Sequence, residues 1–219
     1  MKPMRIVVIG IVQAMACFGI ATGLPVTPVQ AAEPQQVMTE LSTDLFAALE
    51  KEPRAARHNV DKVRPIVDRL LSPHFDSEYA ARLVLGMHWR TATAEQRQQF
   101  ALALYQRLLR TYADAVIDWT PDRFKLLPVV ADPAALRVTV HTLITNSHGA
   151  VVPVDFRMHE TEGGWKIFDV VVDGVSYVRN YHDDTDAEVT QKGLEATIAR
   201  LQRSIVTVRA APVNATSTP

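Results

Sequence analysis

The apolar residues of this chain change their spacing at Pro121, and this change limits the folds that are open to it. Before Pro121 they recur every three or four positions, which is the period of one helix face. After Pro121 they alternate with polar residues, as in a strand with one buried side. A helical half followed by a run of strands predicts an α+β fold rather than an alternating α/β fold.

The first half and the C-terminal part are predicted to be helical. The most definite start is the capping box at 93–96, in which Thr93 and Gln96 satisfy each other's backbone N–H groups. Pro65 is expected in the first turn of its helix and Ser77 at the cap of the next one. The predicted helices cover residues 37–51, 65–71, 77–85, 94–119 and 188–203.

Four strands are predicted, at 123–129, 136–144, 151–158 and 165–172, and they form a twisted antiparallel sheet. The even-numbered residues of the second and third strands are apolar, so one face of the sheet is buried and the other is hydrated. In the fourth strand Trp165, Ile167 and Val171 are assigned to one face, and Phe168, Val170 and Val172 to the other. Both faces of that strand are therefore expected to be covered.

The N-terminal 31 residues have the pattern of a secretory signal peptide. Lys2 and Arg5 precede an apolar run that is too short to span a bilayer, and cleavage is expected after Ala31 or Ala32. The remaining chain is predicted to form one domain, 32–206, with a disordered tail at 207–219.

Charge and cysteine content exclude several function classes. The only cysteine, Cys17, lies in the predicted signal, so the exported protein would have no disulfide and no thiol nucleophile. Removing Lys2 and Arg5 from 23 basic residues leaves three fewer than the 24 acidic ones. Nucleic acid is therefore not an expected partner.

Two segments invite a catalytic or metal-binding interpretation. Ser176 follows a strand, but Gly174-Val175-Ser176 lacks the second glycine of a nucleophile elbow, and a helix cap is the favoured role. His182-Asp183-Asp184 lacks the spacing of metal ligands and is interpreted as a solvated acidic turn. We expect no catalytic residue and no metal site.

The apolar face of the sheet and the 94–119 helix both offer large side chains, and two arrangements are open. The two surfaces either pack together as a solid core or enclose a cavity for an apolar ligand.

Four segments resemble the MlaC (toluene-tolerance) family of periplasmic phospholipid-binding proteins. They are ARLVLGMHWRTATAEQRQQF (81–100), RTYADAVIDW (110–119), VPVDFRM (152–158) and WKIFDVVVDGVSYVRNY (165–181), and the similarity covers roughly residues 37–203. The family usually has Arg and Phe at the positions of His182 and Thr185, so partner contacts through this segment are in doubt.

The resemblance implies a nuclear transport factor 2-like fold whose internal cavity holds the acyl tails of a phospholipid, and it implies no cofactor and no enzyme activity. It further implies a shuttle between an outer-membrane lipoprotein–porin complex and an inner-membrane ABC transporter, which maintains outer-membrane lipid asymmetry. A carrier of hopanoid or another apolar lipid is an alternative, and a lipid-active hydrolase is a weaker one. The expected lipid-binding residues are Phe100, Leu104, Leu108, Tyr112, Val138, Val140, Val154, Phe156, Trp165, Val170 and Val172.

Overall fold

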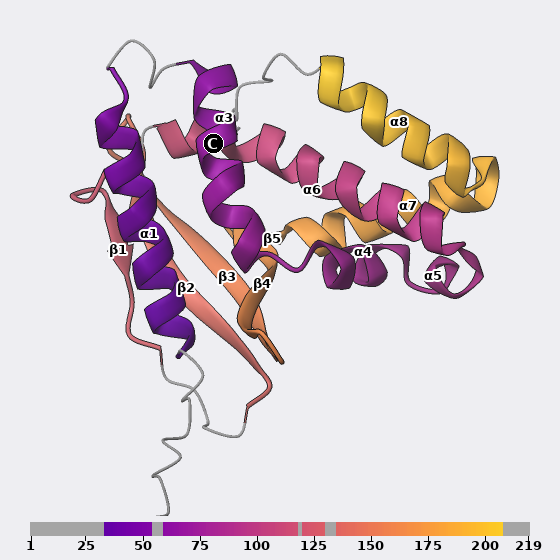
Figure 1. Ribbon diagram of the computed structural model, residues 1–219, viewed down its shortest axis with the longest axis horizontal. Coiled ribbons are helices and arrows are strands. Elements are labelled where there is room, and N and C mark those ends of the chain that lie inside the picture. The colour runs from indigo at the N-terminus through magenta and orange to yellow at the C-terminus, as the bar shows by residue number, and fades with distance from the viewer. Residues whose placement is uncertain (1–32, 54–58, 118–119, 130–134, 208–219) are drawn as a thin grey trace, which may run out of the picture. The chain divides into compact units, whose positions relative to one another are not determined.

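A computed structural model describes residues 33–53, 59–117, 120–129 and 135–207 (Figure 1). The predicted signal peptide, 1–31, lies outside the described residues, and so do residues 208–219 of the predicted tail. Among the described residues, no helix combines the length and apolarity needed to cross a bilayer. The helices are α1 (Pro34–Lys51), α3 (Val60–Leu71), α4 (Ser77–Leu85), α5 (His88–Thr91), α6 (Ala94–Ile117), α7 (Tyr177–Lys192) and α8 (Leu194–Thr207), with a 3-10 turn, η1 (Ser72–His74), after α3.

The residues that cap α3 and α4 differ from the predicted ones. The side chain of Asn59 accepts a hydrogen bond from the Asp61 backbone N–H at 3.0 Å and so starts α3, which places Pro65 inside the helix. Proline cannot donate to the carbonyl four residues earlier, but Val63 and Val67 on either side of it are buried and hold the helix in place. Asp76, and not Ser77, caps α4, because its carboxylate accepts from the Tyr79 N–H at 2.8 Å.

The capping box before α6 is confirmed. The Thr93 N–H donates to Gln96 Oε1 at 3.0 Å, and the Gln96 N–H donates to Thr93 Oγ1 at 3.1 Å. Because both free N–H groups find partners locally, the start of α6 is set by four consecutive residues. Phe100, Leu104 and Leu108 follow on its buried side.

The sheet is an antiparallel meander in the order β1-β2-β3-β4-β5, which confirms the α+β class with five strands where four were predicted. The strands are β1 (Phe124–Leu126), β2 (Arg137–Thr145), β3 (Val151–Thr161), β4 (Gly164–Val172) and β5 (Val175–Ser176). The extra strand arises from the turn at Asp173 (φ 50°) and Gly174 (φ 79°). Two positive φ angles in succession make a tight hairpin, so Val175 pairs with Val172 and Ser176 with Val171.

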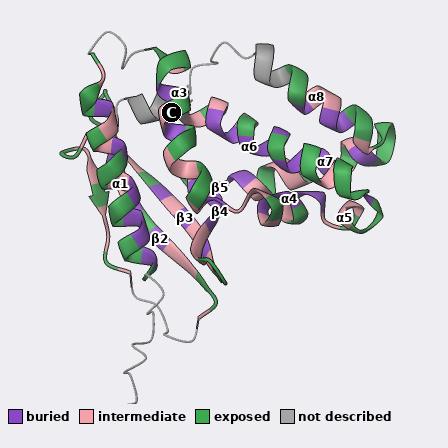
Figure 2. Ribbon diagram, viewed as in Figure 1, coloured by how far each residue is buried: buried purple, intermediate pink, exposed green. Residues whose placement is uncertain are grey.

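The apolar face of the sheet is continuous across three strands. Val140 of β2 lies opposite Phe156 of β3, which in turn lies opposite Val170 of β4. Helices α1 and α3 lie over the sheet, and α6 passes beside them (Figure 1). Buried residues lie on the sides of these elements that face one another (Figure 2).

The predicted division of β4 between two faces is wrong at Trp165 and Ile167. Arg157 pairs with Asp169 but Met158 pairs with Ile167, which leaves Phe168 as the extra residue of a β-bulge. A bulge reverses the alternation of side chains, so Trp165 and Ile167 share the apolar face with Val170 and Val172. Phe168 instead packs edge-on against the Tyr79 ring of α4, with 5.1 Å between ring centroids.

The predicted last helix, 188–203, is two helices. Gly193, with φ 82°, ends α7 and lets the chain turn into α8, a backbone conformation that costs glycine little. The interpretation of His182-Asp183-Asp184 as a turn is also wrong, because all three residues lie within α7.

Candidate functional site

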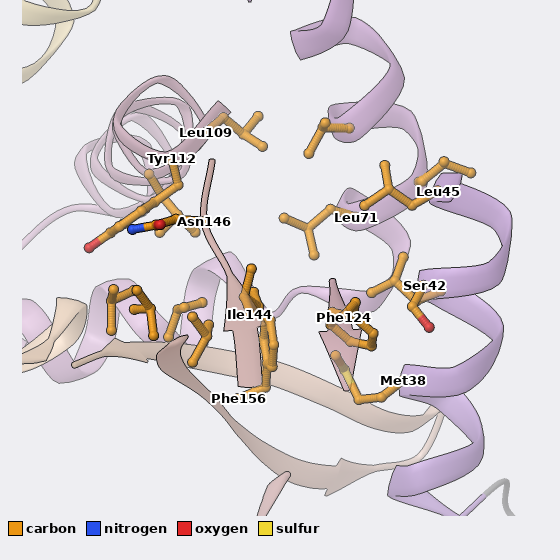
Figure 3. Close-up of a pocket in the computed structure, with 18 residues that line it drawn as sticks. Met38, Ser42, Leu45, Leu71, Leu109, Tyr112, Phe124, Ile144, Asn146 and Phe156 are labelled. Carbon is orange, nitrogen blue, oxygen red and sulfur yellow. The ribbon is translucent and has the colours of Figure 1, made fainter. Parts of the chain in front are cut away.

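An apolar pocket with a volume of about 220 Å³ lies between helices α1, α3 and α6 and the apolar face of the sheet (Figure 3). It exceeds the ~150 Å³ of a cavity that can hold benzene. Its walls are formed by Met38, Leu41, Ser42, Leu45, Val67, Leu70, Leu71, Leu108, Leu109, Tyr112, Phe124, Ile144, Asn146, Val152, Val154, Phe156, Val170 and Val172.

The sheet and the helices both contribute apolar side chains to the pocket wall. Val152 and Val154 of β3 contribute branched but short walls, while Leu41 and Leu45 of α1 reach in from the opposite side. Because the described wall is almost entirely hydrocarbon, water inside the pocket finds few hydrogen-bond partners. An apolar ligand is therefore favoured over water in this space.

Among the described residues, no charged side chain lines the pocket, and three of its lining residues bring polar atoms: Ser42, Tyr112 and Asn146. Ser42 Oγ donates to the Thr39 carbonyl at 3.0 Å. Burial raises the pKa of the Tyr112 phenol, and the nearby Tyr181 and Asp169 raise it further. The Tyr112 hydroxyl is therefore neutral at neutral pH, and the wall suits a hydrocarbon rather than an ion.

Six of the eleven residues predicted to bind lipid lie on the pocket wall: Leu108, Tyr112, Val154, Phe156, Val170 and Val172. The other five lie elsewhere. Phe100, Leu104 and Val140 are almost completely buried in the protein core, and the partly buried Val138 and Trp165 pack against that core. A role of these five in binding would require the pocket to extend beyond its present walls.

Sequence reasoning missed the walls that come from α1 and α3. The spacing of Leu41 and Leu45 identifies a buried helix face, but the same spacing serves a helix that packs on a solid core. Val67, Leu70 and Leu71 lie in the predicted helix 65–71, but their spacing does not distinguish a cavity wall from a solid core.

The segment 165–181 is organised around a buried carboxylate. Asp169, 1% exposed, accepts a hydrogen bond from Ser176 Oγ at 2.6 Å and one from the Val178 N–H at 3.0 Å. It also pairs with the Arg157 guanidinium at 3.0 Å. The turn between β4 and α7 is thereby fixed to the strand that precedes it.

Ser176 is the N-cap of α7, which confirms the favoured interpretation. Its hydroxyl donates to Asp169 and accepts from the Arg179 N–H at 3.0 Å. Both of these bonds hold the helix start. A nucleophilic serine instead requires its hydroxyl to be paired with a base.

Tyr177, the first residue of α7, links that helix to α6, which forms part of the pocket wall. Its hydroxyl donates to the Leu104 carbonyl of α6 at 2.7 Å, and its ring lies edge-on to Tyr112, with 6.3 Å between centroids. Burial raises the pKa of Tyr177 well above its usual value of 10. Tyr177 therefore helps to position α6, whose Leu108 and Tyr112 form part of the pocket wall.

The chain departs from the pattern of the family that it resembles at His182 and Thr185, both in α7, and His182 contacts the end of α4. His182 Nδ1 is 2.9 Å from the Val84 carbonyl oxygen, and Thr185 is completely buried. Among the described residues, no three His, Asp or Glu side chains gather as metal ligands would.

The sequence and the fold are similar to those of known proteins. Residues 39–203 match the family described as MlaC protein. The toluene tolerance protein ttg2D of Pseudomonas putida is 25% identical over 165 residues, 75% of this chain and 76% of that protein. The intermembrane phospholipid transport system binding protein MlaC of Haemophilus influenzae is 24% identical over 184 residues, 81% of this chain and 85% of that protein. A phospholipid-binding protein from Ralstonia solanacearum, solved in complex with a phospholipid, shares the fold with a TM-score of 0.71 and 24% identity, covering 80% of this chain and 98% of the other.

Proposed function

We propose that this chain, which belongs to the MlaC protein family, binds a phospholipid by placing its acyl tails in the pocket beneath α1 and α3. The observation that carries the proposal is the pocket itself, which is larger than a packed core would leave and whose described lining residues are nearly all apolar and carry no charge. The names of the relatives, a phospholipid transport system binding protein and a toluene tolerance protein, agree with this function.

The physical need for such a protein follows from the cost of exposing lipid to water. Each buried CH₂ group contributes about 0.8 kcal/mol, so two tails of about 15 methylenes hide on the order of 20 kcal/mol from water. Unaided transfer across an aqueous compartment would be very slow. A protein that covers the tails removes this barrier.

We further propose that the protein works in the periplasm after removal of residues 1–31. There it would shuttle phospholipid between an outer-membrane lipoprotein–porin complex and an inner-membrane ABC transporter, and so maintain outer-membrane lipid asymmetry. The small excess of acidic residues is consistent with a shuttle, because a strongly basic surface would hold it on anionic lipid.

Native mass spectrometry of protein purified from the periplasm tests the proposal. We expect a complex whose added mass is that of a two-tailed phospholipid. An added mass that matches a hopanoid or another polycyclic lipid would favour the alternative carrier, and protein without bound lipid would contradict both.

We do not propose a hydrolase. The Ser176 hydroxyl is held by Asp169 and the Arg179 N–H, and the Ser176→Ala variant should carry lipid of the same composition as the wild type. Lipid products that disappear in this variant would reverse that conclusion.

A further inference from the structure

Asn146 lies where the pocket wall meets the surface. Two residues before it, Ile144 is 4% exposed, and both residues line the pocket. The four residues after it, 147–150, form the exposed β2–β3 loop. Asn146 is therefore a half-buried polar residue at the boundary between an apolar pocket and solvent.

The orientation of the Asn146 amide is determined by its neighbours. The carboxamide oxygen, Oδ1, accepts from the backbone N–H groups of His148 and Ala150, both at 3.0 Å. An amide nitrogen cannot accept these bonds, so the oxygen must occupy that position. The nitrogen, Nδ2, is left as a donor, and it has no hydrogen-bond partner within the part of the chain that the structure describes.

The two other polar residues on the wall differ from Asn146. Ser42 Oγ already donates to the Thr39 carbonyl, and Tyr112 belongs to the middle of α6, with its pKa raised by burial and by Tyr181 and Asp169. Figure 3 shows Asn146 and Tyr112 above the strands and Ser42 on α1. Asn146 thus combines a fixed orientation with an unused donor.

We propose that Asn146 Nδ2 donates a hydrogen bond to an ester carbonyl of the bound lipid and so selects ester-linked lipids. This inference rests on the proposed function, because it identifies a group that positions the ligand of the same pocket. In a phospholipid the ester carbonyls separate the tails from the headgroup, and they reach the pocket boundary when the tails are inside. Asn146 Nδ2 is not among the fully buried unpaired atoms, so water can reach it when no lipid is bound. When a lipid displaces that water, an acceptor on the lipid avoids leaving the donor unpaired.

The test compares two lipids that differ only in the carbonyl. Protein is mixed with vesicles that contain equal amounts of a diester glycerophospholipid and its diether analogue, with the same headgroup and chain length. The bound lipid is then measured by mass spectrometry. We expect the wild type to prefer the diester about fivefold, the effect of one hydrogen bond of about 1 kcal/mol.

Two variants test whether the Asn146 amide causes the preference for the diester lipid. Asn146→Asp keeps an oxygen for the two backbone N–H groups but has no donor, so the preference should fall to about one. Ser147→Ala changes the exposed neighbour of Asn146, which is not among the residues that line the pocket, and should keep the preference. Circular dichroism checks that both variants are folded, and the wild-type comparison decides the question even if one is not.

Each other result contradicts the inference. Equal binding of both lipids by the wild type would show that the carbonyl is not recognised, as would be the case if Asn146 bound the headgroup phosphate. Loss of the preference in Ser147→Ala, or its retention in Asn146→Asp, would assign it to another group. A wild type that takes up neither lipid would contradict the proposed function itself.

Discussion

At the scale of single residues, the segment between β4 and α7 depends on Asp169. Its carboxylate is buried and accepts bonds from the Ser176 hydroxyl, the Val178 N–H and the Arg157 guanidinium. Arg157 is 41% exposed, so water weakens its charge interaction with Asp169. The buried hydroxyl and N–H therefore account for most of what this carboxylate contributes to stability.

We expect Asp169→Ala to lower the free energy of unfolding by about 2–4 kcal/mol, because it leaves a buried hydroxyl and the first turn of α7 without their acceptor. Urea denaturation followed by circular dichroism measures this. Asp155→Ala is the matched control, since Asp155 pairs at 2.9 Å with His141, whose side chain is 55% exposed. The Asp155→Ala control should lower the free energy of unfolding by less than about 1 kcal/mol. An equal fall in the free energy of unfolding in the two variants would show that the buried bonds of Asp169 add no more stability than an exposed ion pair.

Three tyrosines with a raised pKa predict how stability depends on alkaline pH. Burial is the largest cause of the raised pKa of Tyr105, Tyr112 and Tyr177. The native state therefore favours their neutral form, and this contribution is complete below the unfolded pKa of about 10 and lost as pH rises above it. We expect tyrosinate absorbance to show that these three of the five tyrosines ionise only as the protein unfolds. Five tyrosines that ionise near pH 10 in a native protein would contradict this.

At the scale of elements, the positions of Val140 and Val154 separate pocket from core. Both lie on the apolar face of the sheet, but Val154 lines the pocket while Val140 is completely buried among protein side chains. The same substitution at these two sites therefore has two different outcomes.

Val154→Trp should fill the pocket, so the protein stays folded and loses its lipid. Val140→Trp should strain the core by about 1–3 kcal/mol or more. Thermal melting and the amount of co-purified lipid are measured for both variants. Full lipid content in folded Val154→Trp protein would place the tails elsewhere.

At the scale of the whole molecule, the ligand is expected to be part of the folded structure. A lipid that binds only the native state adds RT ln(1 + [L]/Kd) to stability, about 2.7 kcal/mol at a free concentration of 100 Kd. We expect protein stripped of lipid to melt at a lower temperature and to recover on adding phospholipid vesicles. Melting temperatures unchanged by stripping would show that the pocket needs no ligand.

Lipid binding is also expected to be independent of metal ions. The predicted absence of a metal site rests on the spacing of acidic residues and histidines in the sequence, and the described part of the pocket wall carries none of them. Treatment with a chelator should leave the amount of bound lipid unchanged in native mass spectra. Release of lipid on chelation would require a site that includes residues beyond the described ones.

The features that depend on neighbouring residues were predictable from the sequence. The change of period at Pro121 predicted the α+β class, Thr93 and Gln96 set the start of α6, and Ser176 caps α7. Each depends on contacts within a few positions along the chain, where the sequence lists every possible partner. The same local chemistry misplaced the start of α3 and the cap of α4, because Asn59, well before Pro65, and Asp76, next to Ser77, are the residues that cap these helices.

The pocket was decided by contacts between distant residues. A leucine stripe on α1 has the same pattern over a solid core and over a cavity, and only the position of the helix above short valines of β3 and β4 makes it a wall. The bulge at Phe168 depends on the pairing of β4 with β3, and it turns Trp165 and Ile167 to the apolar face. The unused donor of Asn146 likewise becomes visible only once Oδ1 is paired and Nδ2 is not. Periodicity specifies which side of an element is apolar, whereas the space between two such sides depends on how the whole chain packs.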